Sequence, residues 1–215
     1  MKKKLYQYEL LCMVLFCIIF GIVAWRVQAN GVTMMDTYVQ GLVKGLQTDR
    51  LLVFFSYFTK MGSAIGITSV LIVSLLIFGK KRYYVAMFLY PLAILTTHLV
   101  NKGIKEIVKR DRPSLNEAFD ALGYSFPSGH AMLSIITYGF LAYIIAANLH
   151  NTMSKYISII IAALFIIWIG LSRIILFVHY PTDVLAGYAV GGILLIVTIY
   201  FHRLISERFQ VNQER

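Results

Sequence analysis

Six runs of apolar residues divide this sequence, and each comes close to or exceeds the roughly 20 residues that a helix needs to cross a bilayer core. Only 14% of the 215 residues are charged and 59% are hydrophobic, whereas a soluble domain carries about 25% charged residues. The sequence therefore predicts an all-α, polytopic membrane protein with six transmembrane helices in a single domain, residues 1–215. The runs extend from about Leu10 to Trp25, Leu51 to Gly79, Tyr83 to Val100, Ser128 to Ala147, Tyr156 to Leu176 and Thr182 to Tyr200.

Short basic segments predict how these spans are oriented. Three lysines at positions 2–4 precede the first run, and a basic loop at positions 80–82 follows the second. Positively charged loops tend to stay in the cytoplasm, so we expect both termini to be cytoplasmic in a multi-pass protein of the plasma membrane. Segment 101–127 and the turn around His179 then lie on the extracytoplasmic side. The first run is also typical of a signal peptide, but Arg26 and the later spans favour a retained helix.

The formal net charge of +10 does not indicate nucleic-acid binding, because the basic residues lie at the ends of apolar runs and in one loop. That loop departs from the positive-inside tendency. Although we place it outside the membrane, it carries Lys102, Lys105, Lys109, Arg110 and Arg112. Its charge therefore has another purpose, which we expect to be the binding of an anion.

Residues 31–50 have mixed polarity, and we expect them to form an amphipathic helical segment on the outer surface. The apolar residues of its expected face are Val32, Met35, Val39, Leu42, Val43 and Leu46. The apolar run that follows is longer than one span requires. Lys60 and Gly62 indicate that the span itself begins near residues 60–62.

The first polar cluster contains Lys105, Arg112 and Pro113. If this segment is helical, the seven residues between Lys105 and Arg112 make about two turns, so the two cations point the same way. Arginine binds phosphate through two parallel hydrogen bonds, which suits an oxyanion with several oxygens. The alternative is a basic cluster that touches lipid head groups.

The second cluster is Pro127-Ser128-Gly129-His130, where the fourth span should begin. Serine is a favoured N-cap residue, glycine lets an anion approach the backbone, and the first N–H groups of a helix lack internal partners. Together these features predict an anion site with His130 beside it, placed to exchange a proton. The alternative is an ordinary helix cap with a neighbouring histidine.

The third cluster contains Arg173, His179 and Asp183. Arginine at membrane depth needs a partner, unless it extends to the head groups. His179 and Asp183 are four residues apart, with Pro181 between them at a helix start. This spacing lets the carboxylate bind one ring nitrogen and leave the other free for nucleophilic attack, although a structural His–Asp cap has the same spacing. We expect the fifth helix to end or bend between Arg173 and His179.

The three clusters, read as Lys-x6-Arg-Pro, Pro-Ser-Gly-His and Ser-Arg-x5-His-x3-Asp, resemble the signature of the type 2 phosphatidic acid phosphatases, the lipid phosphate phosphatase family. The resemblance implies that His179 forms a phosphohistidine, that Asp183 holds His179, and that His130 protonates the leaving oxygen and then activates water. It also implies that the phosphate oxygens are held by Lys105, Arg112, Ser128, Gly129 and Arg173.

No metal or other cofactor is implied, and Asp111, Glu117 and Asp120 form no recognisable ligand set. The partners expected are the bilayer and a membrane lipid phosphate. Family members suggest three candidates, namely phosphatidylglycerophosphate, undecaprenyl diphosphate and phosphatidic acid. The extra cations Lys102, Lys109 and Arg110 favour a diphosphate or another highly charged head group. Two histidines that begin in opposite protonation states predict a bell-shaped pH profile. The alternative function is a membrane transporter or anion-binding protein that uses the same cations without hydrolysis.

Overall fold

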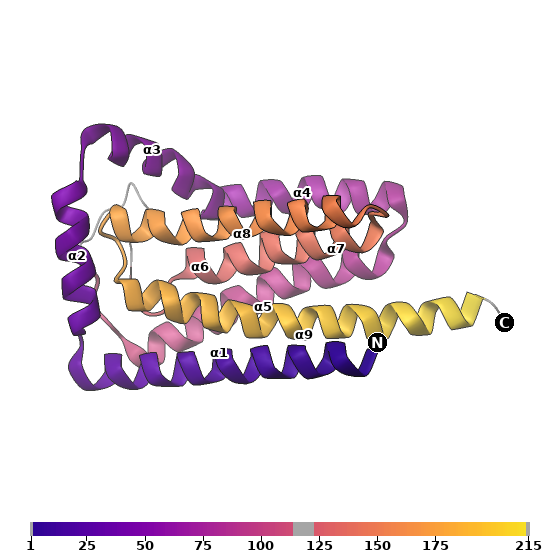
Figure 1. Ribbon diagram of the computed structural model, residues 1–215, viewed down its shortest axis with the longest axis horizontal. Helices are drawn as coiled ribbons and strands as arrows, with labels where there is room; N and C mark the ends of the chain where they lie inside the picture. Colours follow the sequence, from indigo (N-terminus) through magenta and orange to yellow (C-terminus); the bar gives the residue numbers. More distant parts are fainter. Residues whose placement is uncertain (1, 114–122, 214–215) are drawn as a thin grey trace.

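The structure, a computed structural model, describes residues 2–113 and 123–213, and within these ranges the chain forms helices joined by short connections (Figure 1). The first half contains α1 (Lys2–Asn30), α2 (Met34–Leu46), α3 (Asp49–Thr59), the 3₁₀ turn η1 (Lys60–Gly62), α4 (Ala64–Lys81) and α5 (Tyr84–Val108). The second half contains α6 (Gly129–Ser134), the π-helical turn η3 (Ile135–Gly139), α7 (Phe140–Asn148), α8 (Thr152–Ile175) and α9 (Pro181–Gln213).

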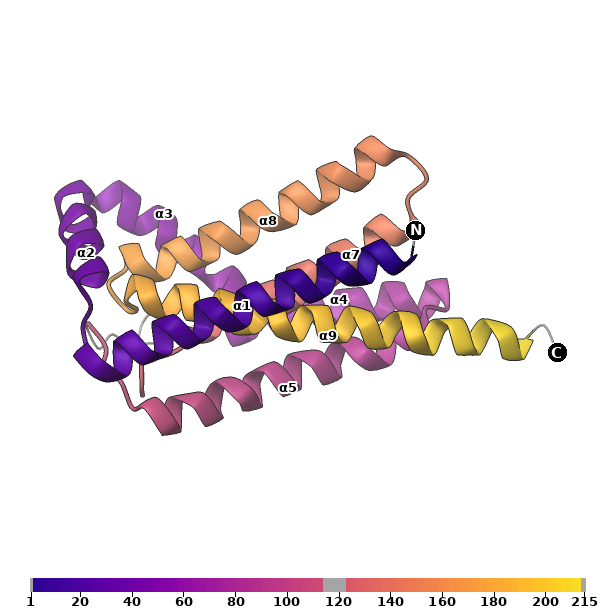
Figure 2. The same ribbon diagram turned by 60° about the horizontal axis from the view of Figure 1, so that its bottom comes forward.

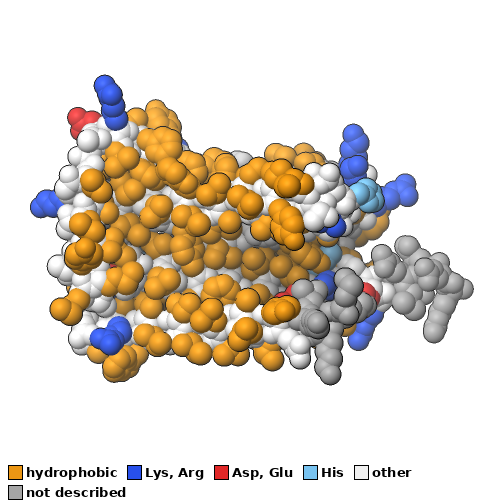
Figure 3. Space-filling view, viewed as in Figure 1, with side chains coloured by type: hydrophobic (Ala, Val, Ile, Leu, Met, Phe, Trp, Pro, Cys, Tyr) orange, Lys and Arg blue, Asp and Glu red, His pale blue; other side chains and the backbone are white. Residues whose placement is uncertain are grey.

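Six helical segments of the described chain are long and apolar enough to cross a membrane, which confirms the predicted six-span, all-α fold. They are Tyr6–Asn30, Ala64–Lys81, Tyr84–Val108, Gly129–Asn148, Thr152–Ile175 and Pro181–Phe209. Figure 3 shows an apolar surface across the middle of the molecule, with most of the charged side chains gathered at its two ends. This distribution is that of a multi-pass membrane protein.

Helix α9 lies at the centre of the arrangement, in contact with α1, α5 and α6. Figures 1 and 2 show α1 running alongside α9, with both chain termini at one end of the bundle. At the opposite end, which we call the α2 end, α2 crosses the bundle instead of running along it (Figure 1). The helices therefore deliver the start of α9, the end of α8 and the end of α5 to the α2 end.

The long second apolar run is broken where the sequence indicated, since η1 at Lys60–Gly62 separates α3 from the membrane span α4. The hydroxyl of Ser63 caps α4 by accepting a hydrogen bond from the backbone N–H of Gly66 at 3.3 Å. A β-carbon at Gly62 would lie 2.5 Å from Ile169 and 2.9 Å from the ring of His130. Glycine at position 62 thus permits the close approach of η1 to α8 and α6.

Helix α2 lies across the end of the bundle, and part of its expected apolar face points inward, since Val39 and Val43 pack against the core. Met35, Leu42 and Leu46 are exposed, whereas Asp36 is completely buried. Asp36 also closes a capping box with Thr33, whose hydroxyl accepts the Asp36 backbone N–H. The inward side of α2 therefore carries a buried carboxylate, with polar partners from other segments, beside these apolar residues.

The contact between α9 and the start of α6 depends on Gly187. A β-carbon at this position would lie 2.7 Å from the backbone oxygen of Ser128 and 2.9 Å from the side chain of Ala131. These distances are shorter than van der Waals contacts, so any larger residue would push α6 away from α9.

We predict that Gly187→Val lowers the stability of the protein by about 1–3 kcal/mol because it overpacks this contact. Gly21→Val is the matched control, since a β-carbon at Gly21 in α1 meets nothing within 4 Å. Thermal unfolding in detergent checks the prediction. Equal midpoints for the two variants would contradict it.

Candidate active site

The residues of all three sequence clusters come together at the α2 end of the bundle. Lys105 lies in the last turn of α5, His130 at the start of α6 and Arg173 in the last turn of α8. Arg173, Lys105 and Arg112 all lie close enough to His130 for their charges to repel a positive charge on its ring. His179 also lies within this range of His130. Segments from separate parts of the chain thus form one cationic site with two histidines.

The His179–Asp183 contact predicted from their spacing is present. Nδ1 of His179 lies 3.3 Å from Oδ2 of Asp183, and both side chains are buried. Asp183 is the third residue of α9, and its Oδ2 also accepts the backbone N–H of Tyr180 at 2.8 Å. Because an ionised carboxylate can only accept hydrogen bonds, this contact assigns the proton of a neutral His179 to Nδ1. The lone pair of the ring then lies on Nε2.

The end of α8 places His179 beside Arg173, and the predicted break between these residues is confirmed. Helix α8 ends at Ile175, and the backbone oxygen of Arg173 accepts the N–H groups of both Val178 and His179 at 3.1 Å. Arg173 is completely buried, and its Nη1 donates to the hydroxyl of Thr59 at 2.7 Å. This burial excludes the alternative in which Arg173 extends to the lipid head groups.

Arg112 reaches the site by a route that the sequence did not predict. The segment from Lys105 to Arg112 is not one helix, since α5 ends at Val108 and Lys109 adopts a left-handed conformation with φ of 49°. Residues before a proline avoid the helical region, and Pro113 directly follows Arg112. From this loop, Nη1 of Arg112 lies 3.0 Å from Nε2 of His179. Arg112 also lies close enough to Lys105 for the two positive charges to repel each other, so both cations belong to the same site.

The start of α6 contains buried polar atoms for which the described residues provide no hydrogen-bond partner. Ser128 occupies the N-cap position of α6, but its hydroxyl makes no capping hydrogen bond, contrary to expectation. The Ser128 hydroxyl oxygen and Nε2 of His130 are buried without a hydrogen-bond partner in the described chain. Gly129 adjoins Asn101, whose oxygen would lie 3.1 Å from an added β-carbon. Buried polar atoms are rarely left unpaired, so this arrangement suits a polar ligand such as phosphate.

Ser125 and Arg110 contact Asp183 directly, in roles that the sequence did not predict, and Asp36 lies behind Arg110. The hydroxyl of Ser125 donates to Asp183 and lies 3.2 Å from Nδ1 of His179. Arg110 is buried between Asp183 and Asp36, with ion-pair distances of 2.5 and 2.6 Å. Arg110 was expected to face a charged substrate, and that expectation is wrong, because both of its terminal nitrogens bind protein carboxylates.

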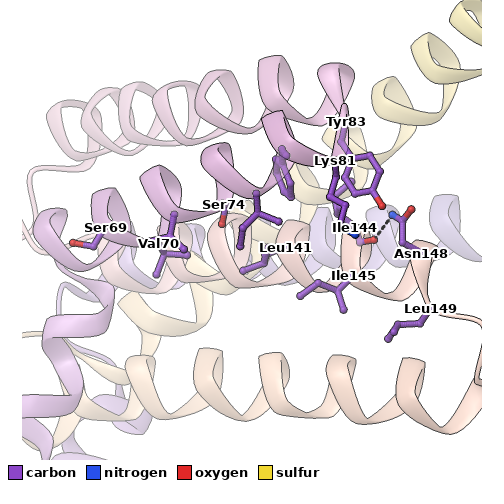
Figure 4. Close-up of a pocket in the computed structure, with 13 residues that line it drawn as sticks. Ser69, Val70, Ser74, Lys81, Tyr83, Leu141, Ile144, Ile145, Asn148 and Leu149 are labelled. Carbon is purple, nitrogen blue, oxygen red and sulfur yellow. Dashed lines mark hydrogen bonds between the residues drawn. The ribbon is translucent and has the colours of Figure 1, made fainter.

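The described residues contain no group of three or more histidine, cysteine or acidic side chains that could hold a metal ion. Glu117 and Asp120, which the sequence analysis considered, lie outside the described ranges. A cavity of about 580 Å³ lies between α4 and α7 and is lined mainly by apolar side chains, together with the polar Lys81 and Asn148 (Figure 4). It lies near the ends of α4 and α7 that are remote from α2, and contains no residue of the three clusters.

Burial lowers the pKa of His179 to about 3, although the neighbouring Asp183 carboxylate opposes this by favouring the charged ring. An ordinary histidine has a pKa of about 6.5. His179 therefore stays neutral in the free protein from pH 5 to 8. The sequence predicted a bell-shaped dependence of the rate on pH. Protonation of His179 in the free protein therefore does not cause the fall in rate on the acid side of that profile.

We predict that the ring signals of His179 do not change between pH 5 and 8 in NMR spectra of the histidine-labelled protein without substrate. The reason is that its pKa of about 3 lies well below this range. His179→Gln identifies the signal by removing it. A titration centred near pH 6.5, the value of an ordinary histidine, would contradict the prediction.

Comparisons with known proteins place the chain in a family. A sequence model described as the PAP2 superfamily matches residues 86–206, more than half of the chain. Phosphatidylglycerophosphatase B of Bacillus subtilis is 31% identical over 147 residues, which cover 66% of this chain and 72% of that protein.

Two solved structures are also similar. The first is a transmembrane PAP2-type phosphatidylglycerolphosphate phosphatase from Bacillus subtilis, with a TM-score of 0.77, 28% identity, and coverage of 90% of this chain and 96% of the other. The second is LpxE of Aquifex aeolicus, with a TM-score of 0.62, 25% identity, and coverage of 79% and 99%. The chain therefore belongs to the PAP2 superfamily and is a lipid phosphate hydrolase.

Proposed function

We propose that this enzyme hydrolyses phosphate monoesters or diphosphates of membrane lipids through a phosphohistidine, without a metal. The observation that carries the proposal is the arrangement of the two histidines. His179 receives its orientation from Asp183 through Nδ1, while His130 presents an unpartnered Nε2 within the same cationic site. A nucleophile held by a carboxylate, with a second proton carrier nearby, is the arrangement that covalent catalysis needs.

In the first step, Nε2 of neutral His179 attacks phosphorus as the bond from phosphorus to the lipid oxygen breaks. Protonated His130 gives its proton to that leaving oxygen. In the second step, neutral His130 takes a proton from water, the water oxygen attacks phosphorus, and the P–N bond breaks. Inorganic phosphate leaves, and both histidines return to their starting states. Asp183 stabilises the positive charge that His179 carries in the intermediate.

Cations hold the phosphate oxygens and offset the charge that develops on them. Lys105, Arg112 and Arg173 supply these charges, and Arg112 turns from Nε2 of His179 to the phosphate when substrate binds. Ser128 contributes its hydroxyl group, which has no partner among the described residues. Its backbone N–H is already used, because it donates to the backbone oxygen of Asp183 at 3.0 Å. Gly129 contributes a backbone N–H from the first turn of the span.

The site faces the extracytoplasmic side, and both termini lie in the cytoplasm. The positive-inside tendency supports this orientation, because the basic loop at residues 80–82 and both termini lie at the end of the bundle opposite α2 (Figure 1). The basic loop that follows α5 departs from the tendency because its charges have other tasks. Arg112 binds phosphate, and Arg110 is neutralised by buried carboxylates.

Among the candidate substrates, phosphatidylglycerophosphate has the strongest support, since the similar curated protein and the similar solved structure from Bacillus subtilis both carry the corresponding phosphatase name. Arg110 no longer supports a diphosphate substrate, because it is bound by Asp36 and Asp183 and does not add to the charge available for a head group. A transporter would need the cations but not a carboxylate-oriented histidine. The His179–Asp183 pair therefore supports hydrolysis.

We predict that the purified enzyme releases phosphate from phosphatidylglycerophosphate in detergent with EDTA present. His130→Ala should reduce the rate by about 10²- to 10⁴-fold, as the loss of a general acid does, and His179→Ala should abolish turnover because it removes the nucleophile. The measurement is phosphate release with time, repeated with undecaprenyl diphosphate and phosphatidic acid. His150→Ala, in an exposed connection remote from the site, is the control and should match the wild type.

Three results would overturn parts of this proposal. Loss of activity in EDTA would indicate a metal enzyme, and full activity of His179→Ala would exclude the phosphohistidine. A higher rate on one of the other two lipids would reassign the substrate and leave the chemistry unchanged.

A further inference from the structure

A second carboxylate lies behind the proposed catalytic pair. Asp36 of α2 is completely buried, and its oxygens accept hydrogen bonds from the backbone N–H groups of Thr33 and Thr182, both at 3.0 Å. The hydroxyl groups of the same two threonines donate to it at 2.8–2.9 Å. These donors hold the side chain of Asp36 in a fixed position, with its two oxygens as acceptors.

Arg110 connects this carboxylate to the catalytic one. Its Nη2 lies 2.6 Å from Asp36, and its Nη1 lies 2.5 Å from Asp183 and 2.8 Å from the hydroxyl of Thr182. The guanidinium group also packs over the ring of Tyr180, at 4.1 Å from the ring centroid. The planar fork of arginine can bind two carboxylates at once, which a lysine ammonium cannot do with the same geometry.

The charge of this cluster matters for the reaction. Arg110 carries one positive charge and would cancel that of Asp183 if the two were alone. With Asp36 present, the three groups sum to one negative charge. That charge is what a positively charged phosphohistidine ring needs beside it, and its effect is strong in a buried site.

From this geometry we propose that Asp36 is a positioning residue that acts through Arg110. It fixes the guanidinium group against Asp183 and takes up part of its charge, so that Asp183 stays effectively negative toward His179. The proposal rests on the function proposed above. It extends the site to α2, which lies outside residues 86–206, the range matched by the family model.

The test is Asp36→Asn, which keeps the size of the side chain and removes its charge. We expect kcat to fall by about 10- to 100-fold, the usual effect of losing an outer partner of an oriented group. KM should change by less than about threefold, because the cations that bind phosphate are untouched. Asp49→Asn is the matched control, since Asp49 lies exposed at the start of α3. It should leave both constants unchanged.

A double variant separates charge from simple packing. Asp36→Asn combined with Arg110→Gln restores the net charge of minus one, so its kcat should exceed that of Asp36→Asn alone. If Asp36→Asn does not fold, Arg110→Lys replaces it in the test. That variant keeps the charge but cannot bridge both carboxylates, so its kcat should fall at constant KM.

Two groups of outcomes would overturn the positioning role. The first is a kcat of Asp36→Asn, or of its replacement Arg110→Lys, within twofold of the wild type, or a raised KM with an unchanged kcat. The second is a double variant no faster than Asp36→Asn. An inactive wild type, or an active His179→Ala, would instead refute the proposed function. If the wild type is active and His179→Ala is inactive, the proposed function stands, and the Asp36 variants then test the positioning role alone.

Discussion

The buried carboxylate of Asp183 is the interaction on which the rest of this site depends. It contacts His179, Ser125 and Arg110 through its side chain, and its backbone oxygen accepts the N–H of Ser128. The segment that follows α5, the connection before α6 and the turn between α8 and α9 therefore meet at one residue in the first turn of α9. A buried charge is costly unless it is paired and hydrogen-bonded. The partners that make this burial possible are also those that orient the histidine.

Close backbone contacts bring these segments together. Gly187 lets the start of α6 lie against α9, and Gly62 lets η1 lie against the ring of His130. Long helices are rigid, so a catalytic geometry at one end of the bundle requires accurate packing along their length. The membrane-facing surface can stay simply apolar, while the precision is confined to the interior near the α2 end.

The sequence predicted much of this arrangement, and its errors have identifiable physical causes. The six spans follow from hydropathy, and the His179–Asp183 contact follows from spacing at a helix start. The helical route from Lys105 to Arg112 was wrong, because the chain leaves the helix at Lys109 and brings Arg110 to the buried carboxylates. Apolar periodicity placed Val39 and Val43 on the face of α2 that packs inward, but it did not reveal the carboxylate with buried partners beside them.

Sequence alone determined the class of protein, the number of spans and the three clusters, since these depend on local composition and on spacing within one helix or turn. Only the tertiary structure decided which cations lie beside the two histidines and which are neutralised by buried carboxylates. Arg110 and Asp36 are 74 residues apart, and their pairing depends on α2 crossing the end of the bundle. Local sequence cannot encode that contact, because a buried ion pair forms only where the packed chain excludes water from both partners.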